Sequence, residues 1–173
     1  MLVRPDVQYR ESFLTGLSEM TSASERSAWI YLGDDSKFNP SKDFDLYVAT
    51  LLAHENDPPA GFVCDSTYWA LAGSEVVGRI ALRHELNEFL GRIGGHIGYI
   101  VRPTARGQGV ATAMLAEVLK MPRAKSMGRL LLTCDATNVA SRKTIESNGG
   151  EFESEIDMGA GRSKKLRFWI TIA

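Results

Sequence analysis

The run from residue 96 to residue 112 limits the possible folds more than any other part of the sequence. It reads as a short apolar strand, a tight turn and the start of a helix, with Gly107 and Gly109 in the turn. Glycine reaches backbone angles that other residues avoid and lets a ligand come close to the chain. The first N–H groups of a helix have no partner within it and lie at the positive end of its dipole. The run therefore predicts a site for a phosphate or pyrophosphate.

Other kinds of glycine-rich site fit this run less well. A dinucleotide-binding fingerprint needs a third glycine, where Thr112 stands, and belongs at the start of a strand–helix–strand unit. A Walker loop needs Gly-Lys followed by Ser or Thr, which this run does not contain. A glycine turn before a helix with no ligand at all stays open as the alternative for this segment alone.

Helical patterns fill the first third of the chain. Apolar residues recur at helical spacing over 6–20, and a weaker pattern covers 24–32. The polar stretch 34–42 predicts a loop. Asp43 is placed to cap a third helix. The apolar face of that helix consists of Phe44, Tyr47, Val48, Leu51 and Leu52.

The period then changes to that of strands. Residues 67–72 are rich in strand formers, and Gly73-Ser74 suits a two-residue hairpin turn. The next strand covers residues 76–83. Strict alternation there would place Val76, Gly78, Ile80 and Leu82 on one face, and Val77, Arg79, Ala81 and Arg83 on the other.

The second half alternates strands with helices and ends in a hairpin. The order is strand 96–101, helix 110–121, strand 129–134, helix 138–147 and a final hairpin over 151–158 and 165–172. Acidic residues alternate along the first hairpin strand and basic residues along the second, which favours one register. The fold class is therefore α/β with a mixed sheet, in a single domain over residues 1–173.

Composition sets limits on partners and location. The chain is 44% hydrophobic and 24% charged, with a net charge of −1, so no global field favours nucleic acid or an anionic membrane as a partner. We expect neither partner, and we expect a cytoplasmic protein because no secretory or membrane-spanning run is present. Cys64 and Cys134 fit no metal-ligand spacing, so we expect free thiols and no metal.

Two motifs give the sequence a family resemblance. Arg106-x-x-Gly109-x-Ala111 resembles the Gln/Arg-x-x-Gly-x-Gly/Ala motif of the GNAT acetyltransferase superfamily, at the same strand-to-helix junction. Downstream, Asn138-x-x-Ser141 with its helix and glycine turn resembles the second motif of that superfamily, in the same order and spacing. The segments 82–90, 94–99 and 167–170 are similar to a bacterial subgroup of predicted acetyltransferases.

The resemblance implies a fold and a cosubstrate. The fold is that of acyl-CoA N-acyltransferases, with a V-shaped splay between the two central parallel strands, 96–101 and 130–134. The cosubstrate is acetyl-CoA. The resemblance implies that the cofactor-binding residues are Ile100, Val101, Arg106, Gly107, Gln108, Gly109, Val110, Ala111, Thr112, Asn138 and Ser141.

The chemistry of acetyl transfer needs a donor to an oxyanion and a route for a proton. The resemblance implies that the N–H of Ile100 or Val101 is the oxyanion donor. His96 fits the position of a base on the central strand, and its reference pKa near 6.5 suits that work. The alternative is that His96 only satisfies a hydrogen bond at the strand start. Glu85, with His84, is the reserve candidate.

The second motif does not supply the acid that protonates the departing thiolate. Ile145 stands in the register where many members of the superfamily carry a tyrosine, and isoleucine cannot donate a proton. Tyr99 or a water molecule would then serve, or the thiolate would leave unaided.

We therefore expect an N-acetyltransferase that moves an acetyl group from acetyl-CoA to an amine by direct attack on the thioester. The alternative is a non-catalytic acyl-CoA-binding or sensing module of the same fold. The acceptor would be a small-molecule or peptide amine, and the protein a monomer or a homodimer. The sequence does not name the acceptor.

Overall fold

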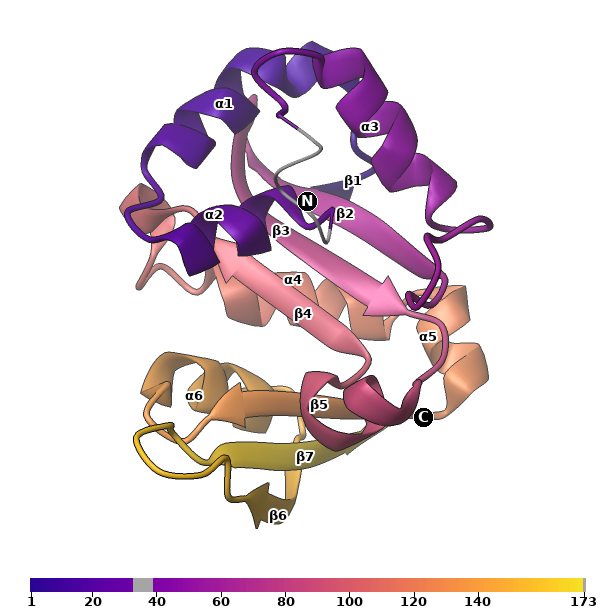
Figure 1. The fold of residues 1–173 in the computed structure, drawn as a ribbon, viewed down its shortest axis with the longest axis vertical. Coiled ribbons are helices and arrows are strands. Elements are labelled where there is room, and N and C mark those ends of the chain that lie inside the picture. Colours follow the sequence, from indigo (N-terminus) through magenta and orange to yellow (C-terminus); the bar gives the residue numbers. More distant parts are fainter. Residues whose placement is uncertain (33–38, 173) are drawn as a thin grey trace.

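The structure is a computed structural model that describes residues 1–32 and 39–172, so the predicted loop at 34–42 lies largely outside the described residues. Figure 1 shows two groups of strands, one above the other, with helices α1, α2 and α3 gathered over the upper group. This arrangement confirms the predicted mixed α/β fold. The strands, however, form two separate sheets and not one continuous sheet.

The first sheet has four antiparallel strands in the order of the sequence. These are β1 (Leu2–Val3), β2 (Asp65–Ala72), β3 (Glu75–Arg83) and β4 (Ile97–Val101). The predicted two-residue turn joins β2 to β3. One face packs against the helices α1 (Arg10–Ser18), α2 (Ala23–Ile30) and α3 (Phe44–Ala53). The opposite face packs against α4 (Val110–Leu119).

Side-chain caps fix where the early helices begin. Asp43 accepts a hydrogen bond from the N–H of Leu46 at the start of α3, as predicted. Ser22 and Glu25 form a reciprocal capping box at the start of α2. This box also fixes Glu25 on the first turn of α2, a position that becomes important in the site described below.

The predicted alternation of β3 is wrong at its first two positions. The register between β2 and β3 shifts between Ala70 and Leu71, so that Ala70 pairs with Gly78 and Leu71 pairs with Val76. Val77 is the extra residue of this bulge. As a result, Val76 packs with the α1–α3 helices, and Val77 packs on the opposite face with Ile80.

The second sheet has three antiparallel strands in the order β5-β7-β6. They are β5 (Arg129–Asp135), β6 (Glu151–Ile156) and β7 (Lys165–Thr171), with α6 (Val139–Ser147) between β5 and β6. A short helix that was not predicted, α5 (Pro122–Met127), follows α4. The opposed charges of the hairpin do meet, because Glu153 forms an ion pair with Arg167 and Glu155 forms one with Lys164. Among the described helices, none is long and apolar enough to span a membrane.

Candidate active site

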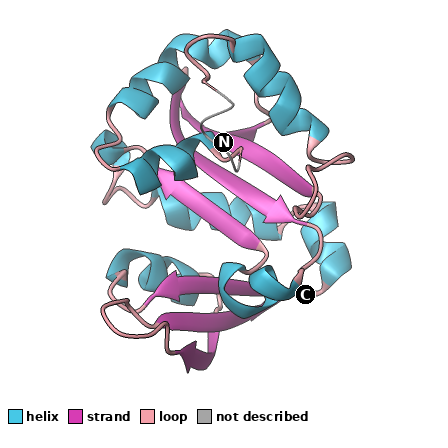
Figure 2. Cartoon of the chain, viewed as in Figure 1, coloured by secondary structure: helices cyan, strands magenta, loops and turns pink. Residues whose placement is uncertain are grey.

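The two sheets meet at one point and diverge from it. The N–H of His96, just before β4, donates to the carbonyl of Leu131 in β5 at 2.7 Å. The N–H of Leu131 donates in return to Nδ1 of His96 at 2.8 Å. Beyond this vertex, among the described strands, β4 pairs only with β3, and β5 pairs only with β7. Figure 2 shows the strands of the two sheets close together on one side and far apart on the other, which matches the predicted V-shaped splay.

A cleft of about 800 Å³ occupies the open side of this V. It is bounded by α2, by β4 with the turn that follows it, by the start of α4, by the end of β5 and by α6. Most of the residues predicted for the site line it. These are Tyr99, Ile100, Val101, Arg106, Gly107, Gly109, Val110, Ala111, Thr112, Asn138 and Ser141. Gln108, His96 and Glu85 are not among the lining residues.

The register of β4 decides which of its backbone groups face the cleft. The pairing of β3 with β4 places Arg79 opposite Ile100, and the N–H of Arg83 donates to the carbonyl of His96. Because hydrogen-bonded pairs alternate along antiparallel strands, the backbone groups of Ile100 bond to β3. The backbone groups of Tyr99 and Val101 point the other way, into the cleft. Of the two predicted oxyanion donors, Val101 is therefore the one that this register leaves open.

The turn after β4 is shaped by its glycines. Gly107 has φ 72° and Gly109 has φ 78°, both in the left-handed region that favours glycine. A Cβ at either position would meet no atom within 4 Å, so the need for glycine is conformational, and the space beside it is open. Gly109 is the N-cap of α4 and carries no side chain to accept the first N–H groups of that helix. These donors remain available to an anion.

Arg106 supplies a cation next to these donors, but it has a partner that the sequence did not reveal. Its Nη2 lies 2.8 Å from Oε1 of Glu25, and its Nε donates to the carbonyl of Val101 at 3.1 Å. The hydrogen bond from Arg106 lowers the pKa of Glu25 to about 2. The sequence predicted only a weaker helical pattern over 24–32, and nothing in it indicated an ion pair between Glu25 and residue 106.

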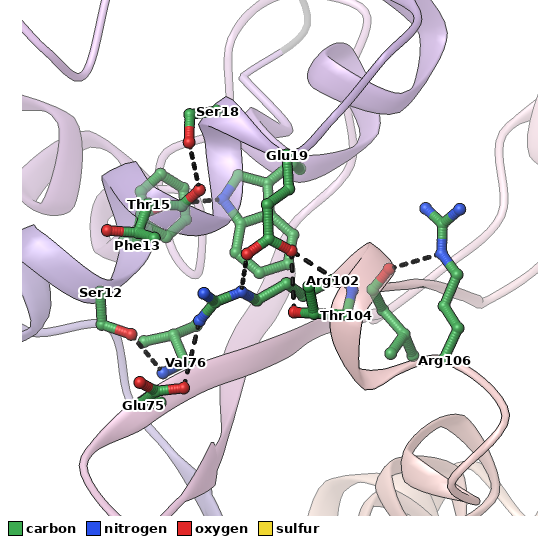
Figure 3. Close-up of polar contacts among 12 residues, drawn as sticks. Ser12, Phe13, Thr15, Ser18, Glu19, Glu75, Val76, Arg102, Thr104 and Arg106 are labelled. Atoms are coloured by element: carbon green, nitrogen blue, oxygen red, sulfur yellow. Dashed lines mark hydrogen bonds and ion pairs between the residues drawn. The ribbon is translucent and has the colours of Figure 1, made fainter.

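A second ion pair holds the turn between β4 and α4 in place (Figure 3). Glu19, just after α1, accepts from Nε of Arg102 at 2.6 Å and from the hydroxyl of Thr104 at 2.9 Å. Arg102 is nearly buried, and its Nη1 also reaches Glu75 at 3.4 Å. These contacts tie the turn to α1 and β3. Their partners lie far apart in sequence, so spacing alone could not have identified them.

The far wall of the cleft is formed by α6. Asn138 is the N-cap of this helix, and its Oδ1 accepts from the N–H of Ser141 at 3.0 Å. The Nδ2 group of Asn138 is therefore the part that could reach a ligand. The hydroxyl of Tyr99, on the opposite wall, lies 2.8 Å from Oγ of Ser141. Burial raises the pKa of Tyr99, so its hydroxyl keeps its proton.

His96 and Glu85 lie outside the cleft. His96 is 8% exposed, and burial lowers its pKa, so the ring is neutral near pH 7. Because Nδ1 accepts the N–H of Leu131, the ring proton is on Nε2, and neither nitrogen has a free lone pair. This geometry favours the alternative role for His96, a hydrogen bond that joins the two sheets. Glu85 is exposed in the segment after β3.

Ile145 is 1% exposed and belongs to the core beneath α6. A Cβ on Gly150 would come within 2.4 Å of its side chain, so the glycine turn packs directly over it. Thr144, the preceding residue, lines the cleft instead. In the described part of the chain, no group of three or more His, Cys, Asp or Glu side chains is arranged to hold a metal ion.

Comparison with known protein families gives a match to the acetyltransferase (GNAT) domain over residues 14–151, which is most of the chain. No curated protein sequence gives a match.

Solved structures with a similar fold are numerous, at low sequence identity. The microcin C7 self-immunity acetyltransferase MccE, solved with acetyl-CoA and AMP, has a TM-score of 0.66 at 13% identity, over 99% of this chain and 91% of that one. A GNAT-family acetyltransferase from Streptococcus pneumoniae has a TM-score of 0.63 at 13% identity, over 100% and 99%. A Salmonella typhimurium enzyme that modifies the N-terminal serine of ribosomal protein L7/L12 has a TM-score of 0.61 at 15% identity, over 99% and 94%.

Proposed function

We propose that this chain, which belongs to the GNAT acetyltransferase family and is an acyltransferase, moves an acetyl group from acetyl-CoA to an amine. In this reaction the amine attacks the thioester directly. The observation that carries the proposal is the cleft between β4 and α6, which brings together Val101, the start of α4 and Asn138. The rest of the cleft fits acetyl-CoA as follows.

The chemistry of the donors suits a pyrophosphate at one end of the cleft. The open N–H groups at the start of α4 and the guanidinium of Arg106 are cationic or partly positive. The volume beside Gly107 and Gly109 is open. An entering pyrophosphate would compete with Glu25 for Arg106, and we propose that Arg106 turns from the carboxylate toward the phosphate when the cosubstrate binds.

The middle of the cleft suits an extended chain that carries amide groups. The backbone groups of Tyr99, and the carbonyl of Val101 once Arg106 has turned toward the phosphate, can bond to such a chain as an added strand would. Nδ2 of Asn138 can donate from the opposite wall, while Oδ1 of the same side chain continues to cap α6. We propose that Val101 and Asn138 together hold the pantetheine arm.

We assign two roles in the chemical step. The N–H of Val101 donates to the thioester oxygen as negative charge develops there. The hydroxyl of Tyr99, held by Ser141 and kept protonated by burial, donates a proton toward the departing sulfur. His96 joins the sheets in this assignment, so the acceptor amine enters neutral, the proton that its nitrogen loses on forming the amide goes to water, and Tyr99 regains a proton from water.

Turnover tests this function against a binding-only role. Purified protein is mixed with acetyl-CoA and a panel of amines, and free thiol release is followed with a thiol reagent. We expect release that depends on the amine, with an acetylated product of matching mass. Acetyl-CoA binding measured by calorimetry, together with no turnover on any amine of a broad panel, would instead support the non-catalytic sensing role.

A further inference from the structure

Two arginines on β3 have no carboxylate partner among the described residues. Arg79 is 2% exposed, and its Nε and Nη2 donate to the carbonyl of Ala28 at 2.8 and 2.5 Å. Its Nη1 has no hydrogen-bond partner within residues 1–32 and 39–172. Arg83 is half-buried, and its Nη1 donates to the carbonyls of Gly94 and Gly95 at 3.3 and 3.0 Å. In contrast, a glutamate pairs with each of Arg4, Arg102, Arg106, Arg142 and Arg167.

The two guanidinium groups share one aromatic ring. Tyr31, the C-cap of α2, has φ 68°, which is unusual for a residue other than glycine. Its ring centroid lies 4.0 Å from Cζ of Arg79 and 5.7 Å from Cζ of Arg83. Asp65 is the acid whose charge acts on both arginines, and it also lies 3.9 Å from Nδ1 of His54. Two cations thus face one buried acid, which leaves an excess of positive charge.

This positive charge lies beside the reacting edge of the cleft. A Cβ built on Gly98 of β4 would come within 3.3 Å of Nη2 of Arg83, so the guanidinium lies over the backbone where a side chain would stand. The next residue along β4 is Tyr99, which lines the cleft. Ala28 and Ile100, on the same side of the sheet as Arg79, also line it. The helix α4, with its phosphate-binding start, covers the opposite side.

The amine must therefore approach from the side of α2, because the cofactor end of the cleft lies on the side of α4. Arg83 is not one of the residues that line the cleft, but its guanidinium lies over Gly98, next to the cleft-lining Tyr99, on that side of the sheet. We propose that Arg83 binds a carboxylate on the acceptor, so that the acceptor class is small amines with a carboxylate near the amino group, such as free α-amino acids. This inference rests on the proposed function and names the substrate class of the same site.

The geometry of Arg83 fits a carboxylate in particular. A guanidinium has five N–H donors in a planar fork, and the two on Nη1 are used by the carbonyls of Gly94 and Gly95. The hydroxyl of Tyr31 also hydrogen-bonds with Arg83, so a carboxylate would compete with that hydroxyl for the edge formed by Nε and Nη2, whose two parallel donors match its two oxygens. The absence of a side chain at Gly98 leaves room for the guanidinium of Arg83 itself to lie flat over β4. A peptide N-terminus or a lysine within a protein lacks the α-carboxylate that a free α-amino acid carries next to its amino group.

The experiment compares acceptors that differ only in the carboxylate. Phenylalanine, phenylalaninamide and phenethylamine are measured with saturating acetyl-CoA, and each kcat/KM is expressed per concentration of neutral amine because their amine pKa values differ. Two further amino acids with their amides guard against a side-chain effect. We expect the wild-type protein to favour the carboxylate-bearing acceptors by at least tenfold.

Variants then assign this preference to Arg83. Arg83→Gln should lower kcat/KM for the amino acids by at least tenfold, mainly through KM, with little change for phenethylamine or for the KM of acetyl-CoA. The kcat/KM of Arg83→Lys for the amino acids should lie between those of the wild type and Arg83→Gln. Arg10→Gln, which removes the same charge from an exposed position on α1, is the matched control and should leave all values unchanged.

Several outcomes would overturn the inference. One is a wild-type protein that uses the amide or phenethylamine as well as the amino acid. Another is an Arg83→Gln protein that loses all acceptors equally. If Arg83→Gln does not fold, as judged by circular dichroism, the test uses Arg83→Lys and the inhibition of the wild-type enzyme by 3-phenylpropionate and by 3-phenylpropanol. Equal inhibition by the acid and the alcohol would count against the inference. If no amine is turned over, the proposed function fails, and calorimetry with N-acetylphenylalanine against its amide still tests the anion site separately.

Discussion

Strand β3 of the first sheet and the edge strand β6 of the second sheet are stabilised in different ways. In the first sheet, β3 has seven consecutive buried residues, because helices cover both of its faces. In the second sheet, the edge strand β6 has no buried residue, and ion pairs with glutamates of β6 link it to basic residues in and beside β7. Dense apolar packing contributes several kcal/mol per large side chain, whereas exposed ion pairs contribute about 0–1 kcal/mol each.

This difference explains how a cleft can open in the middle of the fold. The first sheet and its helices are stable as a packed unit, so β4 can leave one edge without a neighbour over most of its length. The second sheet is joined to it by the shared core beneath α4 and by the backbone contacts at His96 and Leu131. Substitutions should therefore affect stability strongly in the first unit, at the junction to an intermediate degree, and weakly along β6.

The largest effect is expected in the core of the first unit. Phe13 is fully buried, with its ring 4.8 Å from that of Trp69 and 5.3 Å from that of Trp29. Phe13→Ala should lower the free energy of unfolding by about 3–5 kcal/mol, because it leaves a cavity among aromatic rings. Chemical denaturation measures this. Phe152→Ala, on the 58% exposed phenylalanine of β6, is the control and should cost less than about 1 kcal/mol. Equal losses would contradict the contrast between the sheets.

The next largest effect is expected at the junction. Gly95 has φ 68°, and a Cβ there would lie 2.6 Å from the carbonyl oxygen of Leu131, the same oxygen that accepts the N–H of His96. Gly95→Ala combines backbone strain with a contact that only separation of the strands relieves, so we expect a loss of at least about 2 kcal/mol. Gly91→Ala is the control, because a Cβ at Gly91 meets nothing within 4 Å. A stable Gly95→Ala protein would show that the junction does not define the V.

The sequence predicted the parts of the molecule that depend on neighbouring residues. The turn at Gly107 and Gly109 and the cap at Asp43 each rest on a few adjacent positions, and the structure places both as expected for their elements. The family motifs cover the same segments. The cofactor side of the cleft could therefore be outlined from the amino-acid sequence alone, although the binding roles of its residues are still proposals.

The proposed acceptor side could not be outlined in this way. Tyr31, Arg83 and Gly98 come from three elements, and only the paired strands and the end of α2 bring them together. The bulge that turns Val77 to the other face likewise depends on the partner strand, since an alternating pattern does not reveal an extra residue. His96 illustrates the same limit: its strand position suggested a base, but the contact with Leu131 that occupies its ring is made across the vertex.

The vertex hydrogen bond should have a smaller but measurable effect. His96→Leu leaves the buried N–H of Leu131 without a partner and should cost about 1–3 kcal/mol, whereas His96→Gln retains an acceptor and should cost less. If His96 joins the sheets, His96→Gln should change kcat/KM by less than about fivefold. Loss of a general base would typically cost about 10²–10⁴-fold, and a loss of that size would restore His96 as the base.

The same histidine gives a pH signature. Burial lowers the pKa of His96 in the folded protein below its unfolded value near 6.5. Below about pH 6.5, His96 binds a proton in the unfolded chain more readily than in the folded protein. His96 therefore contributes stability above about pH 6.5 and loses it as the pH falls toward its folded pKa. The free energy of unfolding, measured from pH 7 to pH 5, should fall less steeply in His96→Gln than in the wild type.

The cleft itself should respond in binding more than in stability. Gly109→Val forces a β-branched residue to φ 78° beside the first N–H groups of α4, and we expect acetyl-CoA affinity to fall at least tenfold, about 1.4 kcal/mol. Gly161→Val is the matched control, because Gly161 has φ 77°, also meets nothing within 4 Å, and lies outside the cleft. Calorimetry should show full affinity in that control. Equal affinities in both variants would remove the phosphate-site assignment.

The smallest effect is expected on the outer strand of the second sheet. Oε2 of Glu153 lies 2.5 Å from Nε of Arg167, and Oε1 accepts from Nε1 of Trp169 at 2.7 Å. The hydrogen bond from Arg167 lowers the pKa of Glu153 to about 2. This side chain is about a third exposed, so water and salt screen the pair, and Glu153→Gln should cost no more than about 1 kcal/mol at pH 7.

The sign of the pH dependence distinguishes this pair from the general acid sensitivity of the fold. A carboxyl group whose folded pKa is lowered contributes stability above its unfolded pKa and loses it as the pH falls through the folded value. The difference in unfolding free energy between wild type and Glu153→Gln should therefore shrink as the pH falls from 4.5 toward 2, and also as salt is added near neutral pH. Glu151→Gln, which removes a charge at an exposed position of the same strand, is the control for the effect of salt. A Glu153→Gln cost of several kcal/mol that is insensitive to salt would mean that β6 is held as firmly as β3, because only a desolvated pair escapes screening in this way.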